Sequence, residues 1–207
     1  MEIVVANRSH IKFAGIICDT IAVSAQDRGT GIARRTPEYI IQKIELGNGV
    51  IALEGDNFAG FCYIETWDDK EFVVNSGLIV HPDFRKRGLA KKIKKKILDY
   101  SISKYPDAKI FGITTGLAVL KINYELGYQP VTFSELTTDK AFWDGCKTCV
   151  NFDVLKRTEQ EMCLCTGMLY DPIQEKRSLG QPVNLKVLKR LKKIKQALFL
   201  KKRKKTD

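Results

Sequence analysis

One segment, residues 75–100, constrains the fold of this chain more than any other. Its apolar run at 77–80 (GLIV) has the length and composition of a buried β-strand, and a basic loop at 85–90 opens a long helical pattern. Gly88 and Ala90 are small enough to let a ligand approach the backbone, and the first N–H groups of a helix have no intrahelical partners. The segment therefore predicts a strand–turn–helix unit whose helix start binds an anion, most naturally a phosphate.

The sequence VHPDFRKRGLA at 80–90 resembles the acyl-CoA-binding signature of the GNAT family of N-acyltransferases. That signature has the form R-x-x-G-x-A, with arginine or glutamine at its start, and Arg85, Gly88 and Ala90 occupy its defined positions. An ordinary strand–turn–helix unit with a solvated Lys/Arg face is the alternative interpretation. The apolar strand and the V-x-P sequence before the loop favour the interpretation as an acyltransferase signature.

The order of predicted elements also resembles the GNAT fold, an α/β (α+β) architecture with a mixed sheet. Ser9 is expected to cap a first helix at about 11–24, and Thr36 a second helix that ends near Gly47. Further helices are expected after Gly88 and at 117–126. Strands are expected at 2–6, 50–54, 58–67, 71–80, 109–115 and 129–133, with a last strand near 163–170.

The expected domain organisation has three parts: a GNAT-like domain at 1–170 with an insertion at 134–162, a linker at 171–182, and a basic amphipathic segment at 183–207. The sequence has neither a secretory signal nor an apolar run of the roughly 20 residues needed to cross a bilayer, which favours a cytoplasmic protein without a transmembrane segment.

The net charge of +11 comes largely from the C-terminal segment. Eleven of the 35 Lys and Arg residues lie between 186 and 207, so the remainder of the chain is nearly neutral. The segment suits an acidic partner, anionic lipid or nucleic acid, or alternatively docks on the domain as a helix. Because aromatic residues other than Phe199 do not interrupt the lysines, we do not expect a specific nucleic-acid module.

The resemblance implies where acetyl-CoA, or another acyl-CoA, binds as co-substrate. The backbone from Arg87 to Ala90 is expected to hold the pyrophosphate, and the strand at 78–80 to pair with the pantetheine arm. The Val80 N–H would donate to the thioester oxygen, where an oxyanion donor is worth about 3 kcal/mol. The expected CoA-binding residues are Leu78, Ile79, Val80, Arg85, Lys86, Arg87, Gly88, Leu89, Ala90 and Asn123.

The resemblance also implies direct transfer of the acyl group to an amine, without an acyl-enzyme intermediate. The family often has a tyrosine acid four residues before the glycine that ends the helix after the fifth strand. Here that position is Asn123, and Tyr124 is the adjacent candidate acid. The family's frequent base, a glutamate on the fourth strand, has no clear equivalent. Glu65 is the candidate base, acting through water, and a solvent-facing strand residue is the alternative.

Thr114-Thr115, followed by a helix and Gly-Tyr, resembles the acyltransferase domain of N-acetylglutamate synthases. Three arginines, Arg28, Arg34 and Arg35, fall where the acceptor-binding loop of the family lies, and guanidinium groups match carboxylates. The predicted acceptor is therefore a small amine, with an acidic amino acid such as glutamate favoured. A protein N-terminal or lysine acetyltransferase and a non-catalytic acyl-CoA-binding protein are the alternatives, and a homodimer is compatible with each.

The insertion region carries four of the six cysteines, Cys146, Cys149, Cys163 and Cys165. Disulfides are not expected in a chain without a secretory signal. A CxxC pair is common in structural zinc sites, and Cys163 and Cys165 would share one face of a strand. The four thiolates thus predict a structural zinc site, with buried free thiols as the alternative.

Overall fold

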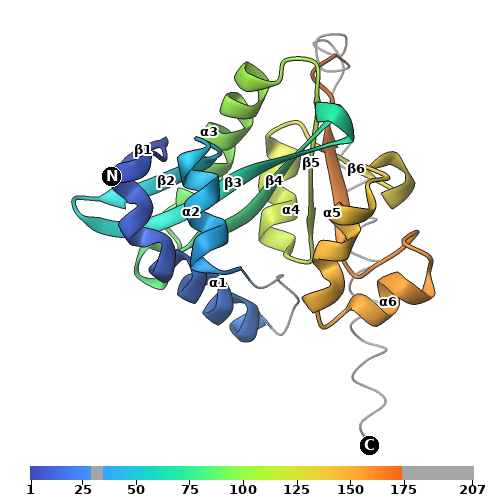
Figure 1. Cartoon of the computed structure of the whole chain (residues 1–207), viewed down its shortest axis with the longest axis horizontal. Coiled ribbons are helices and arrows are strands. Elements are labelled where there is room, and N and C mark those ends of the chain that lie inside the picture. Colours follow the sequence, from blue (N-terminus) through green and yellow to red (C-terminus); the bar gives the residue numbers. More distant parts are fainter. Residues whose placement is uncertain (29–34, 174–207) are drawn as a thin grey trace, which may run out of the picture. The chain divides into compact units, whose positions relative to one another are not determined.

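The computed structural model describes residues 1–28 and 35–173 (Figure 1). The described residues contain a seven-stranded mixed sheet in the order β1-β2-β3-β4-β5-β7-β6. Its strands are antiparallel except for the parallel pair β4 and β5. The strands are β1 (Glu2–Val5), β2 (Gly49–Glu54), β3 (Asn57–Trp67), β4 (Phe72–Val80), β5 (Lys109–Thr114), β6 (Gln129–Val131) and β7 (Thr166–Tyr170).

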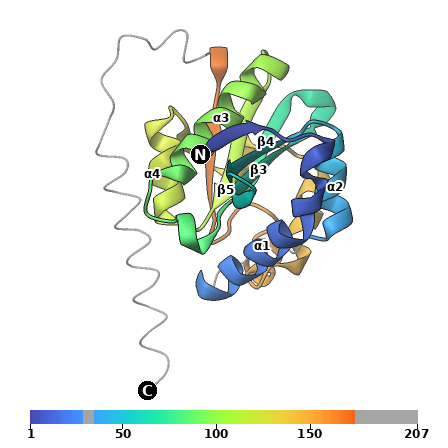
Figure 2. The ribbon, with the colours of Figure 1, turned by 90° about the vertical axis from the view of Figure 1, so that its left-hand side faces the viewer.

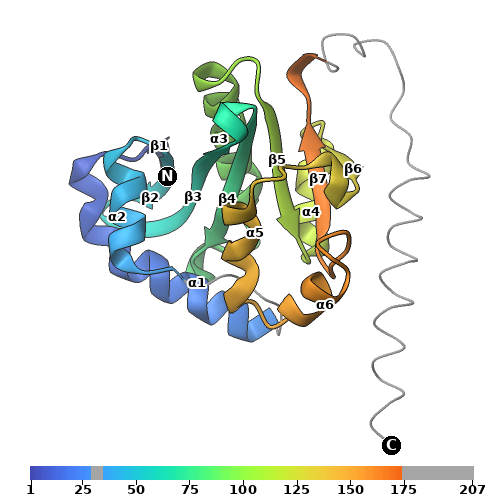
Figure 3. The same cartoon turned by 45° about the vertical axis from the view of Figure 1, so that its right-hand side comes forward.

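Helices cover both faces of the sheet (Figure 2). Successive side chains of β3 point to opposite faces of the sheet and belong to two hydrophobic cores. Phe61 and Tyr63 pack with α1 and α2, whereas Cys62 and Ile64 pack with α3 and α4. Helices α5 and α6, which lie in the segment 134–162 predicted to be an insertion, extend the α1/α2 layer over β4, β5 and β7 (Figure 3). The helices are α1 (Ala14–Arg28), α2 (Pro37–Glu45), α3 (Leu89–Lys104), α4 (Leu117–Glu125), α5 (Lys140–Asp144) and α6 (Phe152–Arg157).

The predicted fold class is confirmed, and most boundaries lie within a few residues of their expected places. Thr36 caps α2 as predicted, since its Oγ1 accepts from the N–H of Tyr39 at 3.3 Å. The cap near the first helix was predicted wrongly. Asn7, not Ser9, is the cap: its Oδ1 accepts from the Ser9 N–H at 3.0 Å, and a 3₁₀ segment, Arg8–Phe13, leads into α1.

The last strand begins later than predicted. Strand β7 starts at Thr166, so Cys163 and Cys165 precede the strand and do not share one of its faces. Apart from residues 171–173, the predicted linker and basic segment lie outside the described residues. Among the residues that the structure describes, no helix is both long and apolar enough to cross a membrane.

Strands β4 and β5 separate after a short paired stretch, which creates the gap that contains the candidate site. Their pairing is confined to Phe72–Val74 with 109–111. In the β3–β4 pair, Phe61 faces Ile79 and Tyr63 faces Ser76, so β4 carries one extra residue there. This β-bulge bends β4 and leaves its edge beyond Val74 without a strand neighbour among the described residues.

Gly77 makes this bulge possible. Its φ is +65°, and a Cβ placed there would lie 2.4 Å from Cε1 of Tyr63. We expect Gly77→Ala to lower the free energy of unfolding by about 2–4 kcal/mol, since left-handed strain and overpacking combine. Thermal unfolding would measure this loss. Gly55→Ala is the matched control, because Gly55 has φ +60° and open space around its Cβ position. An equal loss in both variants would contradict the role assigned to the Tyr63 contact.

Candidate functional site

The gap between β4 and β5 holds a cavity of about 510 Å³. Its walls come from β4, β5, the α2 region, α4 and the insertion. Its polar and titratable lining includes Arg35, Tyr39, Tyr63, Glu65, Lys94, Thr114, Thr115, Asn123, Cys146, Cys149 and Cys165. Titratable side chains and strand backbone therefore both line the cavity, at the point where β4 and β5 separate.

The edge of β4 presents backbone groups to this gap. The His81 N–H donates to the Ala59 carbonyl of β3 at 3.0 Å. Because successive N–H groups alternate sides along a strand, the Val80 N–H points away from β3. The Val80 carbonyl accepts from Nε of Arg85 at 3.2 Å, so the strand end is tied to the basic loop. An extended ligand would find a strand edge here to pair with.

A second hollow of about 380 Å³ lies at the start of α3 and is called the basic groove; its polar lining is Arg85, Lys86, Lys91, Lys121 and Glu125. Val80, Ala118 and Ile122 line the groove, and their chain neighbours Ile79, Val119 and Asn123 line the cavity. The two hollows are therefore adjacent along both β4 and α4.

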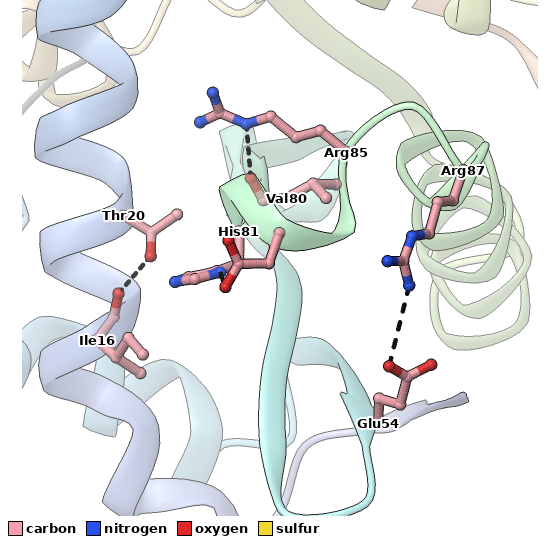
Figure 4. Close-up of polar contacts among 8 residues, drawn as sticks. Ile16, Thr20, Glu54, Val80, His81, Arg85 and Arg87 are labelled. Atoms are coloured by element: carbon pink, nitrogen blue, oxygen red, sulfur yellow. Dashed lines mark hydrogen bonds and ion pairs between the residues drawn. The ribbon is translucent and has the colours of Figure 1, made fainter.

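The loop before α3 leaves helix N–H groups available in this groove. Gly88, the N-cap residue, has φ +72°, and no side chain caps the helix. Lys86 also has a positive φ, +62°. Arg85 also donates to Ser24 Oγ of α1 at 3.0 Å, and Arg87 lies 4.0 Å from Glu54 (Figure 4). Lysines beside a helix start that lacks a cap form a site suited to phosphate groups.

A polar network lines the opposite end of the cavity. Nε of Arg35 donates to the Tyr63 hydroxyl at 2.7 Å, and the Tyr39 hydroxyl donates to Oε1 of Glu65. Nζ of Lys43 lies 3.4 Å from the same carboxylate oxygen, and 4.6 Å from the centre of the Tyr39 ring. The carboxylate of Glu65 is thus held between a hydroxyl and an ammonium.

The two tyrosines of this network stay protonated at neutral pH. Burial raises the pKa of Tyr63 to about 12, and the Arg35 guanidinium beside it opposes that rise. Burial, together with the charges of Tyr63 and Glu65, raises the pKa of Tyr39 well above its ordinary value. Tyr39 therefore acts as a hydrogen-bond donor toward Glu65, and its oxygen has lone pairs with which to accept from a ligand.

The model of the acetyltransferase (GNAT) family matches residues 35–115, which include α2, the β2–β4 meander, the bulge, the basic loop and α3. The chain has the GNAT fold, and residues 35–115 are similar to the GNAT acetyltransferase family. Among curated proteins, none matches this sequence.

Solved structures share the GNAT fold of this chain. N-acetylglutamate synthase from Neisseria gonorrhoeae, complexed with coenzyme A and N-acetyl-glutamate, aligns with a TM-score of 0.59 at 16% identity, over 82% of this chain and 34% of that chain. The structure of yncA from Salmonella typhimurium, with its cofactor acetyl-CoA, aligns with a TM-score of 0.58 at 14% identity, over 83% and 94% of the two chains. This chain therefore spans about a third of the length of that synthase.

Of the predicted catalytic residues and their neighbours, Glu65 and Asn123 line the cavity and Tyr124 does not. Asn123 is 2% exposed, and its Oδ1 has no hydrogen-bond partner among the described residues. Tyr124 packs against the core beside α3. Of the predicted CoA-binding residues, Arg87 lies outside both hollows, while the others line one or the other.

The structure describes only some of the predicted acceptor-binding residues in full. Arg35, Thr114 and Thr115 line the cavity, and Oγ1 of Thr114 accepts from the Gly116 N–H at 3.0 Å. Arg34 lies outside the described residues, and Arg28 is described through its backbone, as the last residue of α1. Their predicted contact with an acceptor stays a prediction.

The four cysteines of the insertion region are free thiols, three of which, Cys146, Cys149 and Cys165, line the cavity. Within residues 1–28 and 35–173, no group of three or more His, Cys, Asp or Glu side chains is arranged to hold a metal ion. A hydrogen bond from Cys165 lowers the pKa of the Cys163 thiol to about 6. The predicted zinc site thus finds no support in the described residues.

Sequence reasoning missed Tyr39, Lys43, Tyr63 and Lys94. The spacing of two between Tyr63, Glu65 and Trp67 was a usable signal, since all three lie on one face of β3 and line the cavity. Tyr39 and Lys43 are four residues apart on α2 and so share one face of that helix. Lys94 shares helical spacing with Ala90, Ile97 and Leu98, so it falls on the apolar face of α3 although exposed lysines flank it in the sequence.

Proposed function

We propose that this protein is an acyl-CoA-dependent N-acetyltransferase that acetylates the amine of a small molecule. The observation that supports this most directly is the strand edge of β4, which lies beside a cavity at one end and a basic groove at the other. Acetyl-CoA has matching parts: a diphosphate, an amide-bearing arm and a thioester. The GNAT family match and the fold shared with CoA-bound proteins support the same assignment.

Each part of acetyl-CoA has residues suited to hold it. The N–H groups at the start of α3, with Lys86 and Lys91, suit the phosphates. The edge of β4 suits the pantetheine amides, and the buried Oδ1 of Asn123 is an acceptor that needs a donor. The Val80 N–H suits the thioester oxygen, where it would stabilise the oxyanion of the tetrahedral intermediate.

The acceptor end supplies a route for the proton. The neutral amine attacks the thioester carbonyl, forming the C–N bond, and the resulting ammonium loses a proton. The oxygen of Tyr39 is positioned to receive a proton while its own hydroxyl proton passes to Glu65. Glu65 is therefore the general base, acting through Tyr39 or through a water molecule in its place.

The chemistry of the acceptor end favours an amino acid with a carboxylate, such as glutamate. Arg35 brings a guanidinium to the cavity, and Thr114 and Thr115 bring hydroxyl groups. The insertion contributes Phe142 and Cys146 to the walls, so that the cavity favours a small molecule over a peptide. A screen that follows thiol release from acetyl-CoA and succinyl-CoA with amino acids, polyamines and peptides would test this. Release with peptides alone would favour the protein acetyltransferase, and binding of CoA with no release would favour the non-catalytic protein.

Arg35 provides a test of the carboxylate assignment. We expect Arg35→Ala to raise the acceptor KM about 10–100-fold with little change in the KM for acetyl-CoA, because a charged hydrogen bond is worth about 1.5–3 kcal/mol. Steady-state kinetics with both substrates varied would measure this. Arg35→Lys is the matched control, which keeps the charge and loses the planar fork, and its effect should be intermediate. Equal KM values for wild type and Arg35→Ala would contradict the assignment.

A further inference from the structure

Lys94 of α3 is a buried amine at the point where β4 and β5 separate. The residue is 2% exposed, and it lines the cavity. Its Nζ donates to Oδ1 of Asn75 at 3.2 Å and lies 4.6 Å from the centre of the Tyr128 ring. A Cβ added to Gly112 of β5 would lie 3.9 Å from this Nζ, which places the amine between the two strands.

The surroundings of Lys94 supply dipoles and no negative charge. Asn75 is fixed in place, since its Nδ2 donates to Ser101 Oγ at 2.9 Å and its Oδ1 also accepts from the Tyr128 hydroxyl at 2.9 Å. The titratable groups facing the amine are Tyr128 and the buried thiol of Cys62 on β3, and burial raises the pKa of both. Among the described residues, no carboxylate forms an ion pair with Lys94.

A buried ammonium without a counter-charge is costly, and two of its three protons have no acceptor in the described contacts. Burial accordingly lowers the pKa of Lys94 to about 8. An anion in the cavity would reverse that cost, because a nearby opposite charge favours the charged form.

Acyl transfer generates such an anion, the CoA thiolate. The family's frequent acid position is occupied by Asn123, whose amide is not an acid at neutral pH, and Tyr124 does not line the cavity. The hydroxyl of Tyr63 is engaged by Arg35 at the acceptor end. Lys94 lies instead where the strands part, next to the β4 edge proposed for the pantetheine arm.

We propose that Lys94 is the acid that protonates the CoA thiolate as it leaves. This inference rests on the proposed function. When the tetrahedral intermediate collapses, the C–S bond breaks and its electron pair goes to sulfur. The Lys94 ammonium donates a proton to that sulfur, giving CoA–SH and a neutral amine. Solvent returns a proton to Lys94 after the products leave, while the proton of the acceptor amine follows the separate route to Glu65.

The first test measures the ionisation of CoA bound to the full-length protein and needs no acceptor. Thiolate absorbs in the ultraviolet, and the complex with desulfo-CoA provides the baseline that removes the protein's own cysteines. We expect the thiol of bound CoA to ionise about 1–2 pH units lower in the wild-type complex than in the Lys94→Met complex, because an ammonium stabilises an adjacent thiolate. The same ionisation pH in both complexes would overturn the proposal.

The second test uses the turnover number. With acetyl-CoA, Lys94→Met should lower kcat about 100-fold or more while leaving the KM for acetyl-CoA within a few-fold. An acetyl thioester whose thiol is more acidic than that of CoA should show a much smaller kcat loss, since its thiolate leaves without protonation. An equal loss with both donors would overturn the proposal, because it would indicate a structural role.

Matched variants keep both tests interpretable. Lys96→Met changes an exposed lysine of the same helix and should behave as wild type. Methionine at position 94 is similar in length and removes a buried charge, so thermal unfolding should show no loss of stability. Calorimetry with CoA tests the proposed function separately from the role of Lys94. Failure of the wild type to bind CoA would refute the proposed function, whereas binding with a Lys94-independent thiol would refute this inference alone.

Discussion

Replacing Gly88 by glutamate is expected to raise the Kd for acetyl-CoA by about 100-fold or more. A side chain at this N-cap position begins within the basic groove, and its carboxylate would compete with the phosphates for the N–H groups at the start of α3. The loss of about two charged hydrogen bonds, each worth about 1.5–3 kcal/mol, is sufficient for that change. Isothermal titration calorimetry with acetyl-CoA measures it directly.

Gly55→Glu is the matched control for this experiment. Gly55 has φ +60° against +72° for Gly88, and a Cβ at either position meets nothing within 4 Å. Both variants therefore carry a similar strain of about 1–2 kcal/mol, visible as a similar decrease in melting temperature. Gly55 lies in the β2–β3 turn and lines neither hollow. An unchanged Kd in Gly88→Glu, or an equal rise in both variants, would refute the placement of the diphosphate.

The half of the candidate site that we propose for CoA could be described from sequence because it consists of backbone. A helix start and a strand edge are fixed by local patterns, and the glycine at 88 marks the left-handed cap that the structure shows. The bulge at Gly77 is harder to predict from a local sequence pattern. Its glycine is visible in the sequence, but the reason for it, the Tyr63 ring beneath, depends on the pairing of β3 with β4.

The half that we propose for the acceptor was less predictable because side chains from separate elements build it. Glu65 was predicted as the base, with a solvent-facing strand residue as the alternative, but the sequence did not show that α2 brings Tyr39 and Lys43 against its carboxylate. Lys94 is a second residue whose surroundings the sequence did not show. Its helical spacing with Ala90, Ile97 and Leu98 places it on the apolar face of α3, but the sequence does not show whether a lysine on that face is fully buried or extends its ammonium to solvent. Burial of a charged group depends on tertiary packing, and composition carries no record of it.

The cysteines illustrate how a spacing rule fails when an element boundary shifts. A strand reaching back to 163 would have placed Cys163 and Cys165 on one face, opposite the CxxC pair. Because β7 starts at Thr166, these two residues belong to the loop that returns from α6. Their thiols hydrogen-bond to each other in that loop, and although Cys146 and Cys149 lie near enough to influence the pKa of Cys165, the described thiols are not arranged to hold a metal ion.

Glu65→Gln is expected to lower kcat about 100-fold or more, with the KM for acetyl-CoA unchanged, because the amide cannot accept the proton of the attacking amine. Glu71→Gln is the matched control, since Glu71 also faces a lysine, Lys109 at 4.0 Å, but on an exposed strand end. Steady-state kinetics with the acceptor identified by the thiol-release screen would measure both variants. A Glu65→Gln enzyme with a normal kcat and a raised acceptor KM would show that Glu65 binds the acceptor and is not the base.

Tyr39→Phe then decides how the proton reaches Glu65. If the Tyr39 hydroxyl relays the proton, its removal should also lower kcat, and the double variant Tyr39→Phe/Glu65→Gln should be no slower than Glu65→Gln alone, because the two groups act as a unit. If a water molecule carries the proton, Tyr39→Phe should retain most of the activity. The hydrogen bond from Tyr39 to Oε1 of Glu65 favours the relay, since the hydroxyl proton is already directed at the carboxylate that receives it.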